Sequence, residues 1–198
     1  MWVRPLLMCS LLFCGPLAWS AAAGEQRDSQ PRDVPSLMNM MAKVASREDR
    51  FTETKTVAVL TKPLVLKGTL AYTRPDRVEK HVLQPYEEHL VVQGDHLTLS
   101  NQEGTKRIAV KSHPLIWSFV EAIRASLAGE VAVLRQLYHI KFQSTEAGWT
   151  LTLRPLDRQA AEHLTSITLT GHGDHLNTVD IREAGGDRSL MQIHGPTS

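Results

Sequence analysis

The fold is decided by the stretch Val65–Val92, which reads V-L-K-G-T-L-A-Y-T-R-P-D-R-V-E-K-H-V-L-Q-P-Y-E-E-H-L-V-V. Its first half alternates between apolar and polar side chains, the pattern of a strand with one buried face. The apolar positions are Leu64, Leu66, Leu70 and Tyr72. Gly68 lies in the middle of this face and packs no side chain, which predicts a bend, a bulge or a close approach of another segment. The strand is expected to end at Arg74-Pro75, because proline cannot donate a hydrogen bond to a sheet.

Arg74 carries a permanent charge at the end of this apolar strand. Its guanidinium either reaches solvent while its aliphatic stem covers apolar surface, or it is a fixed anchor for a polar group. The first is the ordinary behaviour of an arginine at a rim. The pattern alone leaves both interpretations open.

Short runs with period-two spacing continue on both sides of this stretch. In the first half of the chain they cover Phe51–Leu60, Arg77–Leu83, Glu88–Val92, His96–Ser100 and Arg107–Val110. In the second half they cover Tyr138–Gln143, Trp149–Arg154, Leu164–Thr170, Leu176–Ile181 and Arg188–Ile193. The connections carry turn residues and are too short for the crossovers that parallel strands need. We therefore expect about eleven antiparallel strands.

Three segments show helical spacing of apolar residues instead. The first follows the capping sequence Asp33-Val-Pro35-Ser36, and its three methionines are expected mainly to fill the core, although Met also adapts to variable ligands. The second lies between Pro114 and Gly129, and the third covers Glu130–Leu137. Sheet and helices each need an apolar partner. The expected fold class is therefore α+β, mainly β, with one curved antiparallel sheet and helices on its concave face.

Residues 1–23 read as a cleavable signal peptide. Arg4 supplies a positive charge, Pro5–Ala18 is apolar and uncharged, and small residues follow. The apolar run is shorter than the roughly 20 residues that a membrane helix needs. Both cysteines, Cys9 and Cys14, would be removed with this segment, so the exported protein is expected to have no thiol and no disulfide. The bulky Phe13 before Cys14 disfavours a lipid anchor there.

Residues 24–33 are polar and predict a flexible lead-in, and residues 34–198 are enough for one domain that needs neither disulfide nor metal. The chain of 198 residues has 22 basic and 21 acidic residues, and removal of Arg4 with the signal peptide leaves 21 of each. This balance, without a basic stripe, argues against nucleic acid as a partner. An apolar partner is expected instead.

The sequence lacks the common catalytic signatures. Beyond residue 23 it has no cysteine, no G-x-S-x-G, no P-loop and no Gly-rich turn between a strand and a helix. Histidines are the only candidate metal ligands: His172 and His175 flank a turn, and His81, His89 and His96 lie on neighbouring predicted strands. Structural zinc sites usually show tighter, paired spacing. We expect no metal, no cofactor and no enzymatic activity.

Several motifs occur in a characteristic order. In the first half they are Phe51-Thr52-Glu53, Gly68-Thr-Leu-Ala-Tyr-Thr-Arg74-Pro75, Pro85 and Leu90-Val-Val-Gln-Gly-Asp-His-Leu97. In the second half they are Gly148-Trp149-Thr-Leu-Thr-Leu-Arg154-Pro155, Leu164–Leu169 and Gly186-Asp187-Arg188-Ser189. With the signal peptide and the first helix, this ordered set resembles the periplasmic lipoprotein carriers of the LolA family over nearly all of residues 34–198. One departure is Val78-Glu79-Lys80, where family members often carry aromatic residues.

The resemblance implies an unclosed β-barrel, a half-barrel with a helical lid over a hydrophobic cavity that takes acyl chains. In the family, the arginine of the strand-ending Arg-Pro pair matters for closing the lid and releasing cargo, a role that the resemblance assigns to Arg74. Apolar strand faces and the second helix are expected to line the lipid-binding cavity. The expected lining residues are Leu64, Leu66, Leu70, Tyr72, Leu90, Val92, Leu97, Leu99, Leu115, Ile116, Phe119 and Ile123. An ordinary solid core would use the same positions, and only an unfilled interior distinguishes the two.

The resemblance also implies a location and partners. We expect a monomer in the periplasm that takes cargo from an inner-membrane donor complex to an outer-membrane acceptor. The cargo is open between an acylated lipoprotein, a free lipid and a polyene. The alternative function is a periplasmic lipid-sensing module that regulates a protein partner; such regulators usually carry a further domain, which favours the carrier for this chain.

Overall fold

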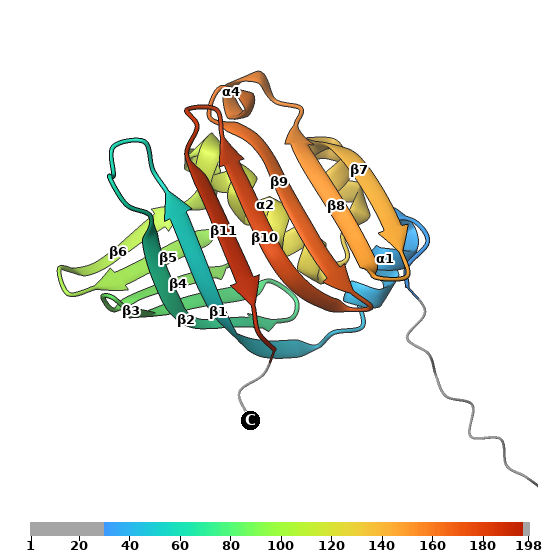
Figure 1. Ribbon diagram of the computed structural model, residues 1–198, viewed down its shortest axis with the longest axis horizontal. Coiled ribbons are helices and arrows are strands. Elements are labelled where there is room, and N and C mark those ends of the chain that lie inside the picture. Colours follow the sequence, from blue (N-terminus) through green and yellow to red (C-terminus); the bar gives the residue numbers. More distant parts are fainter. Residues whose placement is uncertain (1–29, 196–198) are drawn as a thin grey trace, which may run out of the picture.

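The computed structural model describes residues 30–195, which form one antiparallel sheet with helices on one of its faces (Figure 1). The predicted signal peptide and most of the lead-in lie outside these residues. The sheet has eleven strands in the order β6-β5-β4-β3-β2-β1-β11-β10-β9-β8-β7. Because β6 and β7 are its two edges, the sheet is curved but not closed. This confirms the predicted fold class.

The sheet consists of two meanders joined at one seam. Every neighbouring pair is consecutive in the chain except β1 and β11, which pair along Phe51–Thr56 and Arg188–Ile193. The first meander comprises β1 Ser46–Thr56, β2 Leu64–Thr73, β3 Arg77–Gln84, β4 Glu88–Gln93, β5 His96–Asn101 and β6 Gly104–Ala109. The second comprises β7 Tyr138–Thr145, β8 Gly148–Pro155, β9 Leu164–His172, β10 His175–Glu183 and β11 Arg188–Ile193.

Four α-helices and one short 3-10 helix lie among the described residues. They are α1 Val34–Met41, η1 Val110–Ser112, α2 Pro114–Ala128, α3 Val131–Leu137 and α4 Arg158–Ala161. The start of α1 follows the predicted capping sequence, because the Asp33 carboxylate accepts from the Ser36 amide at 2.8 Å and the Asp33 amide donates to the Ser36 hydroxyl at 3.0 Å. At the C-terminus of α2, Gly129 adopts φ 77° and ends the helix.

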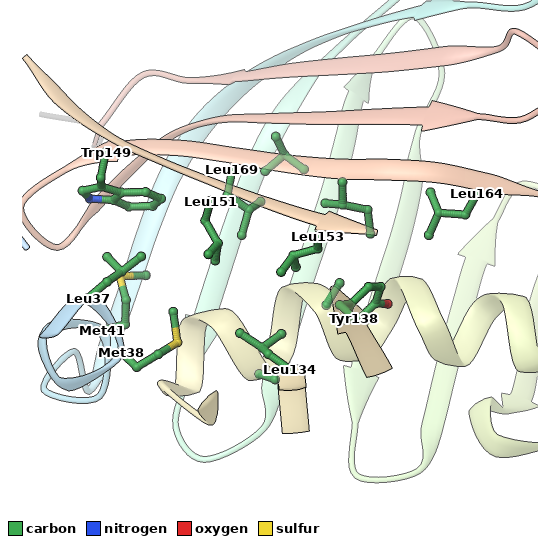
Figure 2. Packing of buried hydrophobic residues seen from close by; sticks show 14 residues of the cluster. Leu37, Met38, Met41, Leu134, Tyr138, Trp149, Leu151, Leu153, Leu164 and Leu169 are labelled. Atoms are coloured by element: carbon green, nitrogen blue, oxygen red, sulfur yellow. The ribbon is translucent and has the colours of Figure 1, made fainter. Parts of the chain in front are cut away.

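The helices pack on the second meander to form the main core (Figure 2). Figure 2 shows Leu37, Met38 and Met41 of α1 facing Trp149 of β8, with the side chain of Leu134 from α3 beside them. All five side chains are at most 3% exposed. Met38 and Met41 therefore fill the core, as predicted, whereas Met40 is only partly buried and lies outside this cluster.

Tyr138 fixes α2 against the start of β7. Its hydroxyl lies 2.8 Å from the Ser118 hydroxyl and also donates to the Ser118 carbonyl. Burial raises the pKa of Tyr138 to about 12, and the bond to Ser118 offsets part of that effect. A neutral, satisfied phenol thus anchors the helix that covers the sheet.

At Gly68 the backbone of β3 lies close to β2. The β2–β3 register shifts between Lys67 and Gly68, and a Cβ at Gly68 would overlap the main-chain carbonyl of His81. The bulge and the close approach predicted for this position are both confirmed.

β1 and α4 differ from what the sequence predicted. β1 covers Ser46–Thr56, whereas the prediction placed the strand at Phe51–Leu60. Residues 57–60 turn instead, because Leu60 donates to the Val57 carbonyl at 2.9 Å and the Ala58 amide donates to Asp187 at 2.8 Å. The four-residue α4, capped by Asp157, is too short to show a helical period and was not predicted.

Candidate ligand-binding cavity

A cavity of about 620 Å³ lies between the first meander, the seam and α2. It could hold about 20 waters at roughly 30 Å³ each, far more space than the few small voids of a packed core. Only about 10 Å³ is left between α1, α2 and the inner faces of β8 and β9, because the cluster of Figure 2 fills this region. The described domain is therefore packed solid over β8 and β9 and hollow over the first meander and the seam.

The roof of the cavity is one apolar face of α2. Its members are Ile116, Phe119, Val120, Ile123 and Leu127. They face apolar positions of the strands, which are Leu70, Tyr72, Val78, Leu90, Val92, Leu97, Leu176, Val179, Ile181, Met191 and Ile193. Because α2 forms this roof, any movement of the helix changes access to the space beneath it.

Eight of the twelve residues expected to line a cavity do line this one. They are Leu70, Tyr72, Leu90, Val92, Leu97, Ile116, Phe119 and Ile123. Leu66 does not, because it is buried in a second, smaller core cluster with Phe51 and Val82, against which Leu64 packs. Leu99 is partly buried without belonging to the lining. Leu115 lies in α2, and its side chain is outside what the structure describes.

The floor of the cavity carries a row of charges that the sequence analysis did not identify. Alternate residues of β1 point inward, and four of these, Arg47, Asp49, Glu53 and Lys55, line the cavity. In the sequence, charges at every second position of a strand predict a solvated face equally well. Only the pairing of β1 with β2 and β11 shows that these charges face the cavity.

Glu53 is the centre of a buried polar network. Its side chain is 4% exposed, and it pairs with the ammonium of Lys80, accepts from the Ser189 hydroxyl at 2.6 Å and lies 3.7 Å from Lys55 Nζ. Burial alone would raise the pKa of Glu53, but Lys80, Ser189 and Lys55 together hold it below its ordinary value. Burial lowers the pKa of Lys80, and Glu53 opposes that change. Both oxygens of Glu53 therefore have partners.

Arg74 lies at the end of β2, beside α1. Its guanidinium donates to the carbonyl of Ala42, the residue that caps the C-terminus of α1, and its amide donates to the Ala45 carbonyl at 2.9 Å. The side chain is exposed. The geometry thus combines the two interpretations of the sequence, since the residue is at the rim and is also tied to a helix end.

Exposed apolar residues gather at the end of the sheet where β1 ends and β2 begins. Val59 and Leu60 lie in the loop between these strands and are 87% and 48% exposed. Leu83 and Tyr86 are exposed near the adjoining β3–β4 hairpin. Val57, at the start of the same loop, lines the cavity. Val57 thus connects the β1–β2 loop to the cavity.

The candidate metal ligands do not converge. The rings of His81 and His89 are 5.2 Å apart, but they contact Glu87 and Glu79 respectively. Within residues 30–195, no three His, Cys, Asp or Glu side chains gather in a way that could hold a metal ion. In the same range no helix is long and apolar enough to cross a membrane.

An open antiparallel sheet around an apolar cavity, covered by helices, is the architecture of lipid- or lipoprotein-binding carriers. The chain belongs to the family described as outer membrane lipoprotein carrier protein LolA-like, whose model matches residues 27–196. This confirms the resemblance found in the sequence. No curated protein matches the chain.

Solved structures with similar folds come from several bacteria. The LolA superfamily protein NE2245 from Nitrosomonas europaea is 9% identical, with a TM-score of 0.45 over 84% of this chain and 92% of that chain. A putative outer membrane lipoprotein-sorting protein domain from Vibrio parahaemolyticus is 10% identical, with a TM-score of 0.43 over 81% and 88% of the two chains. The structure of the Pseudomonas aeruginosa MucA/MucB complex is 12% identical, with a TM-score of 0.44 over 84% of this chain and 59% of that chain.

Proposed function

We propose that the protein is a periplasmic carrier that binds the acyl chains of a lipid or lipoprotein in its cavity and shuttles this cargo from the inner to the outer membrane. The observation that carries the proposal is the unfilled space of about 620 Å³ under α2. Each buried methylene contributes about 0.8 kcal/mol, so several methylenes of one acyl chain give useful affinity without any reactive group. Membership in the LolA-like family supports the same function.

Exchange with a membrane needs a way in and out of the cavity. Arg74 is suited to control it, because its bond to Ala42 joins the end of β2 to the C-terminus of α1. Breaking this bond would loosen the C-terminal end of α1, where Met41 lines the cavity, whereas making it would hold that end in place. The apolar loop with Val59 and Leu60 is the part suited to meet a lipid surface or a membrane-bound partner.

A cavity-filling variant tests the proposal. Leu90→Trp places a large side chain in the cavity, while Val65→Trp places the same side chain on the outer face of β2, where Val65 is 45% exposed. Both purified proteins and the wild type are assayed for transfer of a fluorescent phospholipid between donor and acceptor vesicles. The carrier function predicts that wild type and Val65→Trp accelerate transfer and that folded Leu90→Trp does not. No acceleration by the wild type, or equal acceleration by all three, contradicts it.

A further inference from the structure

Asp49 differs from the other charged residues on the cavity floor because it has no partner. Glu53 is satisfied by Lys80 and Ser189. Asp49 is 8% exposed, lines the cavity, and its buried Oδ1 accepts no hydrogen bond from any described residue. Most buried polar groups in proteins are paired, so a buried carboxylate oxygen without a donor calls for an explanation.

The two basic side chains that act on Asp49 are directed elsewhere. Arg47, two residues away on the same face of β1, donates from Nη1 to the Asp174 carbonyl at 2.6 Å and places Nη2 3.2 Å from the Asp174 carboxylate. His175 Nε2 lies 3.4 Å from that same carboxylate. Leu70, directly opposite Asp49 on β2, has no donor to offer. Arg47, and His175 in its protonated form, act on Asp49 only through longer-range attraction.

An acceptor in this situation is costly once an apolar ligand displaces water from the cavity. A buried group without its hydrogen bond keeps its desolvation penalty, which is larger if the group is charged. Burial correspondingly raises the pKa of Asp49, against the attraction of Arg47 and His175. A purely hydrocarbon ligand would leave this cost in place, whereas a ligand with a suitably placed donor would remove it.

We propose that Asp49 is a polar recognition site inside the cavity, which accepts a hydrogen bond from an O–H or N–H group of an otherwise apolar ligand. The site rests on the carrier function proposed above and narrows its substrate class to acyl ligands with a donor on or next to the chain. A hydroxyl of a free lipid and the amide N–H of an acylated amino terminus both have this chemistry. An anionic group would face the carboxylate and is disfavoured.

Matched pairs of ligands with twelve-carbon chains test the site. 1-Dodecanol is compared with dodecyl methyl ether, and N-methyldodecanamide with N,N-dimethyldodecanamide, so that each pair differs in one donor. Binding is measured by displacement of diphenylhexatriene from the protein. The wild type is expected to bind at least one donor-bearing ligand about tenfold more tightly than its methylated partner. A preference within the alcohol pair indicates a hydroxylated lipid, and one within the amide pair indicates an acylated amino terminus.

Variants of Asp49 assign any preference to this residue. Asp49→Leu should reduce the affinity ratio to about one, and Asp49→Asn should keep part of it, because its amide oxygen still accepts. Leu97→Ala, elsewhere in the lining, should weaken both ligands of a pair equally and leave the ratio unchanged. Ratios near one in the wild type, or a ratio that survives Asp49→Leu, would overturn the site while leaving the carrier intact. Failure of all four ligands to bind the wild type would overturn the carrier function itself.

Discussion

Substitution of Lys80 by methionine removes the ammonium from the buried network while keeping a side chain of similar length. Glu53 would then be left at 4% exposure with Ser189 and the more distant Lys55. The Lys80 ammonium also lies 5.3 Å from the centre of the Phe51 ring, and this cation–π contact would be lost. Lys80→Met therefore leaves a carboxylate inside the domain with its main partner gone.

The expected cost is about 2–3 kcal/mol. Loss of one partner from a buried ion pair typically costs about 3–5 kcal/mol. The expected cost lies at or below the lower end of this range because Lys80 borders a cavity and is 19% exposed, and because Ser189 and Lys55 remain beside Glu53. For a domain of this size that corresponds to a fall in Tm of about 4–12 °C. Urea and thermal unfolding followed by circular dichroism measure both quantities.

Two comparisons make this prediction specific. Lys55→Met removes a cation 3.7 Å from Glu53 that is 38% exposed, and it should cost less than about 1 kcal/mol. The double variant Glu53→Leu/Lys80→Met removes the whole pair and should be more stable than the sum of the single changes predicts, by about 2 kcal/mol. If Lys80→Met stays within about 0.5 kcal/mol of the wild type, or if the two changes are additive, the network does not stabilise the domain as described.

Three further predictions concern the acid dependence of Glu53, the close approach at Gly68 and the role of Arg74. The pKa of Glu53 is held below its ordinary value of 4.5, so the stability that Glu53 contributes is complete above about pH 4.5 and disappears as the pH falls through the lowered pKa. Glu53→Gln should flatten this acid dependence in thermal unfolding between pH 7 and pH 3, and an unchanged slope contradicts the assignment. Gly68→Ala should cost about 1–3 kcal/mol, because its methyl group meets the β3 backbone, whereas Gly185→Ala, with open space around it, should be close to neutral; similar unfolding midpoints for both variants would refute the close approach. Arg74→Leu should purify with more bound lipid than the wild type and deliver less lipid to acceptor vesicles. Arg74→Lys should show a partial defect, because lysine keeps the charge but loses the planar guanidinium. Equal lipid occupancy and equal lipid transfer in all three proteins would show that Arg74 has no role in release.

Most of the fold could be predicted from the sequence because its signals are local. Turn residues separate short period-two runs, and the connections permit only antiparallel neighbours. The helix stop at Gly129 and the bulge at Gly68 are equally local, since each depends on a residue without a side chain. The elements missed, η1 and α4, are single turns, and the only signal of α4 is the cap at Asp157.

The cavity was less predictable because it depends on residues far apart in the chain. Period two places Leu66 and Leu70 on one face of β2, but Leu66 meets Phe51 and Val82 in a packed cluster, while Leu70 borders open space. The charges of β1 face inward because β1 pairs with β11, more than a hundred residues later in the chain. No local pattern distinguishes such a strand from one with a solvated face.

Mass spectrometry of organic extracts from the purified protein tests the carrier function most directly. The protein is purified without detergent, and Leu90→Trp is extracted in parallel, because its added side chain occupies the cavity. We expect the wild type to retain an acylated molecule at close to one per chain, and the variant to retain much less. Repeated absence of any lipid from the wild type, or equal lipid in both proteins, would contradict a carrier that binds acyl chains in this cavity.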